Sequence, residues 1–280
     1  MRWNGFWIYQ IKSGIEREIT MHGTYIGNDK MLVKLAYNAF LTISSKDLSV
    51  MPLLVSTGIF EAPLTKFFLT NVKPGNVVVD IGTNVGYFTV LASKLVGDQG
   101  RVIGFEANPE LVLNVKDNLA MNWTTENTKI INKAVYSQNT VLNFRTSEKF
   151  HAYSSIHEKP KDENLVDNYS LIEVNAVTLD SELQDIEFID LLKIDIEGGE
   201  YHAFLGMMGL IERKRIKRIT FEWNRPMLGD EAEKFLRLIS DILNRLSGRL
   251  YLIDQEGNTD PTTLKEISSV EFYPFALIEF

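Results

Sequence analysis

From Val77 onward, apolar runs of strand length alternate with segments whose apolar residues recur every three or four positions. This alternation is typical of an α/β fold, because neighbouring parallel strands need a helical crossover between them. Val77 to Asp80 predicts the first strand. A helix from about Gly86 to Leu95 follows and stops at Gly97, a residue type favoured just after helices. The pattern therefore predicts a largely parallel sheet.

The alternation continues along the chain. Arg101 to Glu106 predicts a second strand, and Asn108 then caps a helix that has Pro109 at its first position. The remaining predicted strands are Lys129 to Val135, Leu191 to Asp195, Ile216 to Trp223, Arg249 to Asp254 and the terminal FALIEF, and the remaining helices run from about Glu200 to Ile211 and from Asp230 to about Arg245.

Two parts of the chain do not follow this pattern. TVLNFRT and SLIEVNAV look like strands that flank a polar stretch, and that stretch is too long for a simple connection. We interpret about 140–177 as a flap insertion. At the N-terminus, WIYQI, REITM and FLTIS predict short antiparallel strands. The expected division is a β-rich cap over residues 1–57 and a main domain over residues 58–280.

Composition restricts the classes of function. The chain has no cysteine, which excludes disulfides, thiolate catalysis and cysteine metal sites. Its 29 basic and 37 acidic residues give a net charge of −8, which opposes a nucleic acid partner because phosphate binding needs a positive surface. No apolar run is long enough to span a bilayer, and the start lacks the apolar region of a signal peptide. A cytoplasmic location is therefore expected.

The first strand leads directly into the glycine-bearing turn DIGTNVG. Such a turn lets a ligand approach the backbone at a helix N-terminus, although a tight turn can also need glycine for its geometry alone. Nicotinamide-binding proteins place G-x-G-x-x-G here, whereas Gly82 and Gly86 are four residues apart and Asn84 replaces the middle glycine. Asp80 would repel a phosphate and suits a cationic or hydroxyl-rich ligand such as S-adenosylmethionine.

Glu106 closes the second strand, about 20 residues beyond the glycine turn. An acid at this place accepts hydrogen bonds from the ribose hydroxyls of an adenosine ligand. Acids at strand ends are also often simply solvated. Because the turn and the acid occur in the correct register, together they favour an adenosine ligand.

Several motifs together resemble the FkbM family of S-adenosylmethionine-dependent O-methyltransferases: VVVDIGTNVGYFT, VIGFEANPE, KAV, TLDSEL and LLKIDIEGGEYHAFLG. STGIFEAPLTKF resembles the segment that leads into that family's domain, and the resemblance covers roughly Gly58 to Ile253. It implies a class I methyltransferase fold, a Rossmann-like seven-stranded sheet in the order 3-2-1-4-5-7-6 with strand 7 antiparallel. The cofactor-binding residues that it implies are Glu61, Asp80, Gly82, Thr83, Asn84, Gly86, Glu106, Ala107, Ala134 and Asp195.

The fourth strand ends in three carboxylates, in LLKIDIEGGE. In the implied sheet this strand lies beside the first, so Asp195 and Asp80 would end side by side at the edge where open α/β sheets bind ligands. Asp195 would face the sulfonium, and Glu197 is the better candidate for contact with the acceptor. Gly198 would let the backbone pass close to cofactor or acceptor. Glu200 begins the next helix, where its charge suits the dipole, with a catalytic role as the alternative.

Methyl transfer to an alcohol is an in-line displacement in which a base should take the hydroxyl proton. Asp195 and Glu197 are the first candidates for this base, and Glu222, at the end of the fifth strand, is the third. A divalent metal held by Asp195, Glu222 and Asn224 is a competing hypothesis, since oxygen ligands suit magnesium. Neither the spacing nor the resemblance requires a metal, and none is expected.

The flap segment FHAYSSI supplies the candidates for substrate contact. His151 could close over the acceptor, with Ser154 and Ser155 beside it, although a surface histidine is the alternative reading. Gly198 completes this set of substrate candidates.

The sequence therefore predicts an S-adenosylmethionine-dependent O-methyltransferase that acts on a hydroxyl of a small molecule or glycan. Three alternatives remain: methyl transfer to a nitrogen, a carboxyl or RNA; a non-catalytic module with a methyltransferase fold; and a Rossmann oxidoreductase, which the absent G-x-G-x-x-G opposes. The acidic balance opposes RNA only. A homo-oligomer is left open, with the Trp- and Tyr-bearing N-terminal segment as a candidate partner surface.

Overall fold

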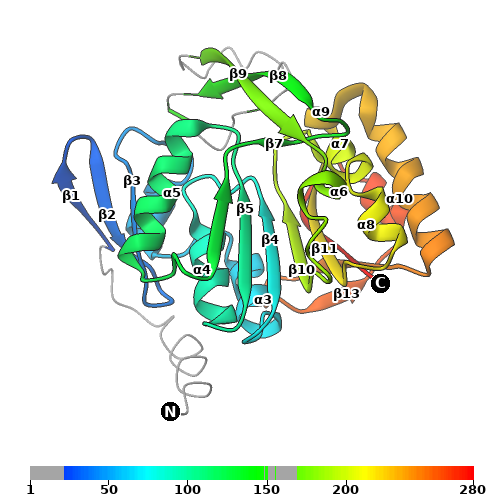
Figure 1. Ribbon diagram of the computed structural model, residues 1–280, viewed down its shortest axis with the longest axis horizontal. Helices are drawn as coiled ribbons and strands as arrows, with labels where there is room; N and C mark the ends of the chain where they lie inside the picture. Colours follow the sequence, from blue (N-terminus) through cyan, green and yellow to red (C-terminus); the bar gives the residue numbers. More distant parts are fainter. Residues whose placement is uncertain (1–21, 148, 151–154, 156–168) are drawn as a thin grey trace.

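The computed structural model describes residues 22–147, 149–150, 155 and 169–280 (Figure 1). Its central feature is an eight-stranded mixed sheet in the order β13-β12-β14-β11-β10-β4-β5-β6. The strands of this sheet are β4 (Val77–Ile81), β5 (Arg101–Phe105), β6 (Thr128–Ile131), β10 (Leu191–Ile194), β11 (Arg218–Asn224), β12 (Arg249–Ile253), β13 (Thr259–Pro261) and β14 (Phe272–Glu279).

The α/β class predicted from the sequence is confirmed. Within the main sheet, the neighbouring strands β6, β5, β4, β10 and β11 run parallel to one another. Strand β14 runs antiparallel to both β11 and β12. Without β13, and numbered along the chain, the strands lie in the order 3-2-1-4-5-7-6. The eighth strand, β13, was not predicted; it pairs antiparallel with β12 at the edge of the sheet. Residues 254–258 make the turn that joins them.

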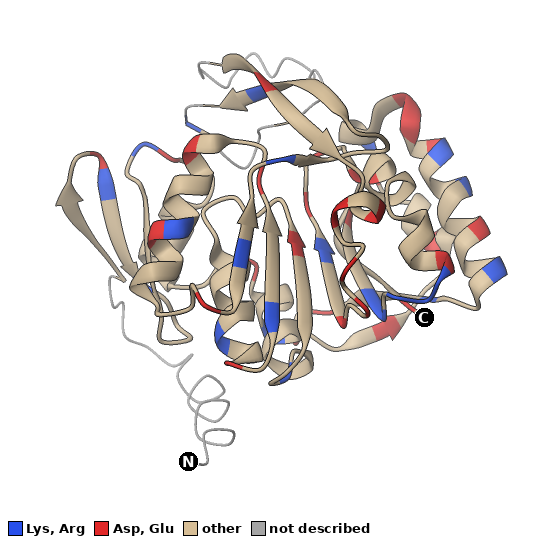
Figure 2. Ribbon diagram, in the orientation of Figure 1, with Lys and Arg blue, Asp and Glu red and all other residues tan. Residues whose placement is uncertain are grey.

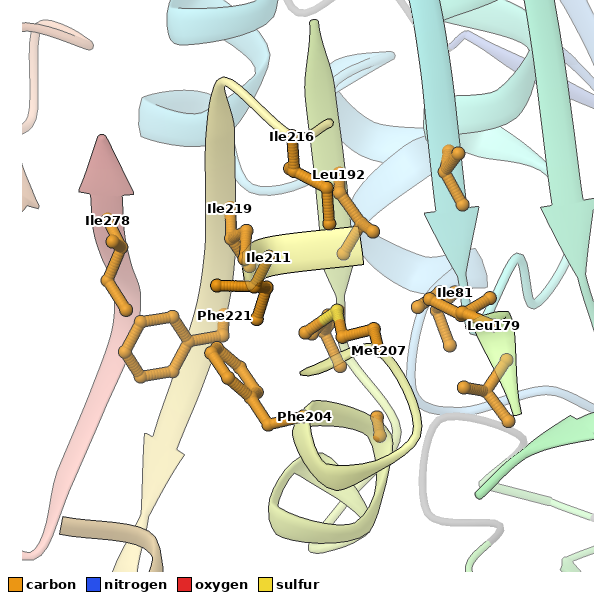
Figure 3. Packing of buried hydrophobic residues seen from close by; sticks show 14 of the residues in the cluster. Ile81, Leu179, Leu192, Phe204, Met207, Ile211, Ile216, Ile219, Phe221 and Ile278 are labelled. Atoms are coloured by element: carbon orange, nitrogen blue, oxygen red, sulfur yellow. The ribbon is translucent and has the colours of Figure 1, made fainter. Parts of the chain in front are cut away.

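Helices cover both faces of the sheet, because successive strand residues point to opposite sides. Val78 belongs to the apolar cluster under α3, α4 and α5, whereas Val79 and Ile81 belong to the cluster under α7, α8 and α10. In the second cluster Phe204 packs edge-on against Phe221, with ring centroids 5.4 Å apart (Figure 3). These helices are α3 (Ala62–Asn71), α4 (Tyr87–Val96), α5 (Pro109–Met121), α7 (Glu200–Leu205), α8 (Met208–Glu212) and α10 (Ala232–Leu246).

The single helix predicted from Glu200 to Ile211 is wrong, since the chain forms α7 and α8 with a break at Gly206. A Cβ on Gly206 would lie 2.1 Å from the carbonyl oxygen of Tyr136, so this position packs directly against another segment. Asp180 then accepts hydrogen bonds from the backbone N–H groups of Gly209 and Leu210 at 2.8 and 2.6 Å. This carboxylate starts a new helix by satisfying amides that would otherwise lack partners.

The third predicted strand, Lys129 to Val135, is also wrong in extent. Only β6 joins the main sheet, and β7 (Ala134–Val135) pairs with β9 in a separate sheet. The side chain of Asn132 donates to the carbonyl oxygens of Glu106 and Ala107 at 2.9 and 3.0 Å, which holds the turn between β6 and β7. The turn carries Ala134 over the carboxyl end of the main sheet.

The two strands predicted around the flap are confirmed as β8 (Thr140–Ser147) and β9 (Tyr169–Val177), which pair antiparallel. Figure 1 shows this hairpin above the carboxyl ends of the parallel strands. Ser155 exchanges two backbone hydrogen bonds with Arg145 of β8, at 3.0 and 3.1 Å. His151 and Ser154 lie outside the described residues.

The described part of the N-terminal region forms the antiparallel sheet β1-β2-β3, with β1 (Gly23–Gly27), β2 (Lys30–Lys34) and β3 (Phe40–Ser44). FLTIS is thus confirmed as a strand, whereas WIYQI and REITM lie outside the described residues. Asn118 of α5 is fully buried, and its amide accepts from Thr42 N at 2.7 Å and donates to Val85 O at 2.9 Å. The β3 strand is therefore fastened to the main sheet's helices, and the division at residue 57 stays a prediction.

The remaining short elements are α2 (Met51–Thr57), α6 (Leu179–Glu182), α9 (Arg225–Leu228), the 3₁₀ helix η2 (Gly229–Glu231) and α11 (Leu264–Ser268). Among the described residues, no single helix has the length and apolar composition needed to cross a membrane, although α2 and α3, which are bent by 67° to each other, meet the criterion jointly.

Candidate active site

A pocket opens at the carboxyl edge of the main sheet and encloses about 1150 Å³ of empty space, open solvent at its mouth included. Eight of the ten residues predicted for the cofactor line it: Glu61, Gly82, Thr83, Asn84, Glu106, Ala107, Ala134 and Asp195. The three base candidates, Asp195, Glu197 and Glu222, also line it. Asp80, Gly86, Gly198 and Ser155 do not.

The glycine turn brings two strand ends together. Gly82 has a φ of +81°, and a Cβ there would lie 2.0 Å from the carbonyl oxygen of Asp195. Gly86 has a φ of +88° and stands immediately before α4, with Val115 packed against it. Glycine is thus required here by backbone conformation and by the approach of β10 to β4, whatever ligand the turn holds. Both readings of the motif are compatible with this geometry.

Glu106 braces the two loops on either side of it. Its Oε2 accepts from Asn84 N at 2.8 Å and its Oε1 from Asn108 N at 2.9 Å. Burial raises the pKa of the Glu106 carboxyl to about 7, against the lowering effect of these backbone hydrogen bonds. Each carboxylate oxygen can accept a further hydrogen bond, so this bracing leaves capacity for hydroxyl groups in the pocket.

Three buried polar atoms of lining residues have no hydrogen-bond partner within the described part of the chain: Thr83 Oγ1, Asn84 Oδ1 and Glu61 Oε2. Buried polar groups in folded proteins nearly always have partners. Orphaned acceptors and a hydroxyl on the walls of one pocket therefore fit a ligand that carries hydrogen-bond donors. A nucleoside with an ammonium group, such as S-adenosylmethionine, supplies them.

Asp80 is buried next to the pocket but is not among the residues that line it, and its contact with the cofactor stays a prediction. Its side chain is only 1% exposed, and its Oδ2 accepts from Thr89 Oγ1 at 2.6 Å. Its Oδ1 lies 3.5 Å from Lys193 Nζ. Burial raises the pKa of Asp80, while Lys193 and Thr89 act in the opposite direction. Asp80 contacts the pocket-lining Lys193.

Lys193 was missed in the sequence analysis. It is 2% exposed, lines the pocket, and places Nζ 3.3 Å from Asp195 Oδ2 and 3.5 Å from Asp80 Oδ1. Figure 2 shows a basic position in β10 beside an acidic position in the neighbouring β4. Burial lowers the pKa of Lys193, but Asp195, Asp80 and Glu61 outweigh it and hold this pKa above its usual value. The available signal was a lysine inside an apolar strand, because a buried cation needs paired carboxylates.

Glu200 closes the loop after β10. It is fully buried, and its carboxylate accepts from Ile196 N at 3.1 Å and from Gly198 N at 2.9 Å. Gly198 has a φ of +103°, and Gly199, not Gly198, lines the pocket. The contacts of Glu200 support its structural role, and the substrate contact of Gly198 stays a prediction. Gly199 could not be separated from Gly198 by residue type alone.

Four carboxylates from three parts of the chain line the pocket: Glu61 before α3, Asp195 and Glu197 after β10, and Glu222 in β11. Burial is the main cause that raises the pKa of Glu61 to about 8, and the negative charge of Asp195 adds to it. Burial also raises the pKa of Glu222 to about 10, with smaller contributions from the charges of Asp195 and Glu197. The aromatic rings of Phe60, Tyr87 and Phe88 line the same pocket.

Ser155 contacts the active-site loop and not the pocket. Its hydroxyl donates to the carbonyl oxygen of Glu197 at 2.7 Å, and the residue is 1% exposed. Glu197 has a φ of +55°, a conformation that side chains adopt rarely outside turns. Ser155 therefore supports the backbone of Glu197, and its contact with the substrate stays a prediction.

Asn224, one of the three ligands in the competing metal hypothesis, forms hydrogen bonds within the fold. Asn224 donates through Nδ2 to Glu222 Oε2 at 3.2 Å, and its Oδ1 accepts from Met227 N at 3.3 Å. Both ends of this amide are thus used within the fold. In the part of the chain that the structure describes, no group of three or more His, Cys, Asp or Glu side chains is arranged to hold a metal ion.

Comparison with known proteins adds a family. The model of the methyltransferase FkbM domain matches residues 80–252, more than half of the chain. Similar curated proteins include an arsenite methyltransferase from Halobacterium salinarum, with 39% identity over 49 residues, which cover 18% of this chain and 12% of that protein. A ribosomal RNA large subunit methyltransferase E from Bdellovibrio bacteriovorus is 45% identical over 40 residues, which cover 14% of this chain and 20% of that protein.

The matched segments thus span a fifth or less of these curated relatives. Among solved structures, an O-methyltransferase from Bacillus cereus in complex with SAH (S-adenosylhomocysteine) is similar at 12% identity and a TM-score of 0.42. That similarity covers 79% of this chain and 80% of the other.

Proposed function

Because this chain belongs to the FkbM family of S-adenosylmethionine-dependent methyltransferases, we propose that it moves the methyl group of that cofactor to a hydroxyl of a small molecule or glycan. The observation that carries the proposal is one pocket lined both by the glycine turn with Glu106 and by four carboxylates with three aromatic side chains. We assign the first set to the adenosine end of the cofactor and the second set to its methyl end.

At the first end, Glu106 is proposed to accept hydrogen bonds from the two ribose hydroxyls, since its oxygens keep acceptor capacity beyond Asn84 N and Asn108 N. Ala107 and Ala134 offer small side chains beside the adenine. Asp195, held by Lys193, faces the cationic end of the cofactor. When bound, S-adenosylmethionine supplies a methyl group on a positively charged sulfur.

At the second end, we assign the general base to Glu222. A general base must accept the acceptor's hydroxyl proton, and a carboxylate with a higher pKa does so more readily as long as it is ionised at the working pH. The pKa of Glu222 is raised to about 10, further than that of Glu61 or Glu106 on the same pocket wall. Asp195 is a weaker candidate because it forms an ion pair with Lys193. Glu197, supported by Ser155, is proposed to orient the acceptor.

The proposed acceptor is uncharged, and no nucleic acid partner is expected from a chain of net charge −8. The similarity to a ribosomal RNA methyltransferase makes RNA the acceptor to test against. A cytoplasmic location stays a prediction from the sequence, as does any oligomeric state.

The decisive experiment is calorimetric titration of the chain with S-adenosylmethionine, followed by transfer of a labelled methyl group to sugar, alcohol, amine, carboxylate and RNA probes. Glu106→Gln should weaken cofactor binding about tenfold or more, because hydrogen bonds to a charged group are worth about 1.5–3 kcal/mol. Glu110→Gln, an exposed acid just after it, is the matched control.

Folded protein that gives no heat with either S-adenosylmethionine or S-adenosylhomocysteine would contradict the proposed function. Heat with NAD in their place would favour the oxidoreductase. Cofactor binding without transfer to any probe would favour the non-catalytic module, and transfer to RNA alone would overturn the small-molecule or glycan acceptor.

A further inference from the structure

We propose that Glu222 loses a proton when S-adenosylmethionine binds, so that the base exists only while the methyl donor is in place. This inference rests on the proposed function and adds to it a coupling between cofactor charge and base ionisation. It follows from how carboxylates and cations are distributed around one end of the pocket.

The carboxylates converge from chain segments that are far apart in the sequence. Glu61 precedes α3 in a left-handed conformation with a φ of +42°, Asp195 and Glu197 follow β10, and Glu222 lies near the end of β11. Like charges confined in a partly enclosed site cannot all remain ionised, and at least one of them then keeps a proton.

The nearby cations are already engaged. Lys193 Nζ lies between Asp80 and Asp195, at 3.5 and 3.3 Å. Lys133, the other lysine on the pocket wall, pairs with Glu182 at 2.7 Å. Among the described residues, neither Glu61 nor Glu222 has a cationic side chain within 4.0 Å. Lys193 thus neutralises the charges of Asp80 and Asp195, whereas no cationic side chain of the described residues is close enough to pair with Glu61 or Glu222.

The surroundings of each glutamate determine which one holds its proton more tightly. Burial raises the pKa of Glu222 to about 10, helped by Asp195, Glu197 and Glu200, while the hydrogen bond from Asn224 acts in the opposite direction.

Burial raises the pKa of Glu61 only to about 8, because Lys193 opposes the effects of Asp195, Glu197 and Asp80. In the empty pocket at neutral pH, Glu222 is therefore the more firmly protonated of the two.

Binding of a cationic cofactor should favour the ionised form of Glu222 over the protonated form. S-adenosylmethionine carries a sulfonium, an ammonium and a carboxylate, for a net charge of about +1 near neutrality. An opposite charge within about 4–6 Å lowers the pKa of a carboxyl by about 1–3, which would bring that of Glu222 from about 10 to between about 7 and 9. The proton then leaves to solvent, and Glu222 becomes able to act as a base.

The reaction restores the starting charge state. As the acceptor oxygen bonds to the methyl carbon, its O–H bond breaks and the proton passes to the Glu222 carboxylate. The electron pair of the broken S–C bond stays on sulfur, which becomes a neutral thioether. The positive charge on sulfur and the negative charge on Glu222 disappear together, so charge balances. Protonated Glu222 is again the favoured form until the next donor binds.

The test is titration calorimetry near pH 7.5 in phosphate, HEPES and Tris, whose ionisation enthalpies differ, so that the slope gives the protons released. We expect release of a clear fraction of a proton, up to about one, per S-adenosylmethionine and less per S-adenosylhomocysteine, which lacks the sulfonium. Glu222→Gln should bind the cofactor with a smaller release, the remainder coming from Glu61. Glu256→Gln, an exposed acid paired with Lys66, should release protons like the unaltered chain.

A second measurement on the unaltered chain covers the case in which Glu222→Gln fails to fold. The affinity ratio of S-adenosylmethionine to S-adenosylhomocysteine should rise with pH from about 7 to 8.5, by up to about tenfold per pH unit, because proton release favours binding as protons become scarce.

Each outcome bears on a different statement. Binding of S-adenosylmethionine with no buffer dependence, or with the same release as S-adenosylhomocysteine, overturns this inference and leaves the proposed function standing. Unchanged release in folded Glu222→Gln overturns the assignment to Glu222. Absence of binding overturns the proposed function itself.

Discussion

Lys193 has the largest influence of any single residue at the site, because it compensates carboxylates on two adjacent strands. It stands opposite Asp80 in the register of β10 and β4, and its ammonium also reaches Asp195. The side chains of Lys193 and Asp80 are 3% and 1% exposed, so water cannot replace Lys193 as the partner of Asp80. The fold depends on this ion pair in addition to any role that it has in binding.

Lys193→Met should therefore destabilise the fold by about 3–5 kcal/mol, since it leaves an uncompensated buried charge. Lys66→Met, which removes an ion pair at the exposed Glu256, should cost no more than about 1 kcal/mol. Urea unfolding near pH 7 measures both values. A loss in Lys193→Met as small as that of the control would contradict the structural importance of the buried pair.

At the scale of elements, short polar contacts decide where helices begin and end. The pattern of apolar residues from Glu200 to Ile211 is compatible with one helix, yet the chain breaks at Gly206 and starts α8 under the carboxylate of Asp180. Asp180 belongs to α6, so the break depends on a contact between two elements.

Asp180→Ala should destabilise the protein by about 1–2 kcal/mol, because it leaves the amides of Gly209 and Leu210 without an acceptor. Hydrogen exchange should show faster exchange at these two amides. Asp241→Ala, which removes an exposed i,i+4 pair with Arg245, should leave them unchanged. Equal protection of the two amides in Asp180→Ala would contradict the capping role.

At the scale of the whole molecule, buried acids from distant parts of the chain lie in and around the pocket. We expect the protonation of these acids to control how the stability of the fold depends on pH. Burial raises the carboxyl pKa of Glu106 and Glu200 to about 7 each, from a usual value of 4.5. Together with Glu61 and Glu222, they bind protons more tightly in the folded state than in the unfolded state.

A group with a raised pKa stabilises the fold below its unfolded pKa, and this contribution is lost as the pH rises through the folded value. The empty protein should therefore lose stability between about pH 5.5 and 8.5, as measured by urea unfolding at several pH values. Glu106→Gln should flatten this dependence. An unaltered protein that is equally stable, or more stable, at the higher pH would contradict the burial of these acids as the dominant cause.

Much of the architecture follows from local patterns in the sequence. Runs such as VVVD and LLKID set strand positions, Asn108 and Pro109 set the start of α5, and the glycine turn and Glu106 identified one end of the pocket. These features depend on backbone preferences and on burial of one side of an element, and both are encoded by residues close together in the chain.

The state of charge at the site was decided only by tertiary structure. The sequence determined that Asp80, Lys193, Asp195 and Glu222 stand at strand ends or within strands of an α/β sheet. It did not determine that Lys193 lies between two aspartates. Nor did it determine that burial and the acids of another loop raise the pKa of Glu222. Electrostatic interactions act over a few ångströms in space, and packing brings together groups that the chain separates by more than a hundred residues.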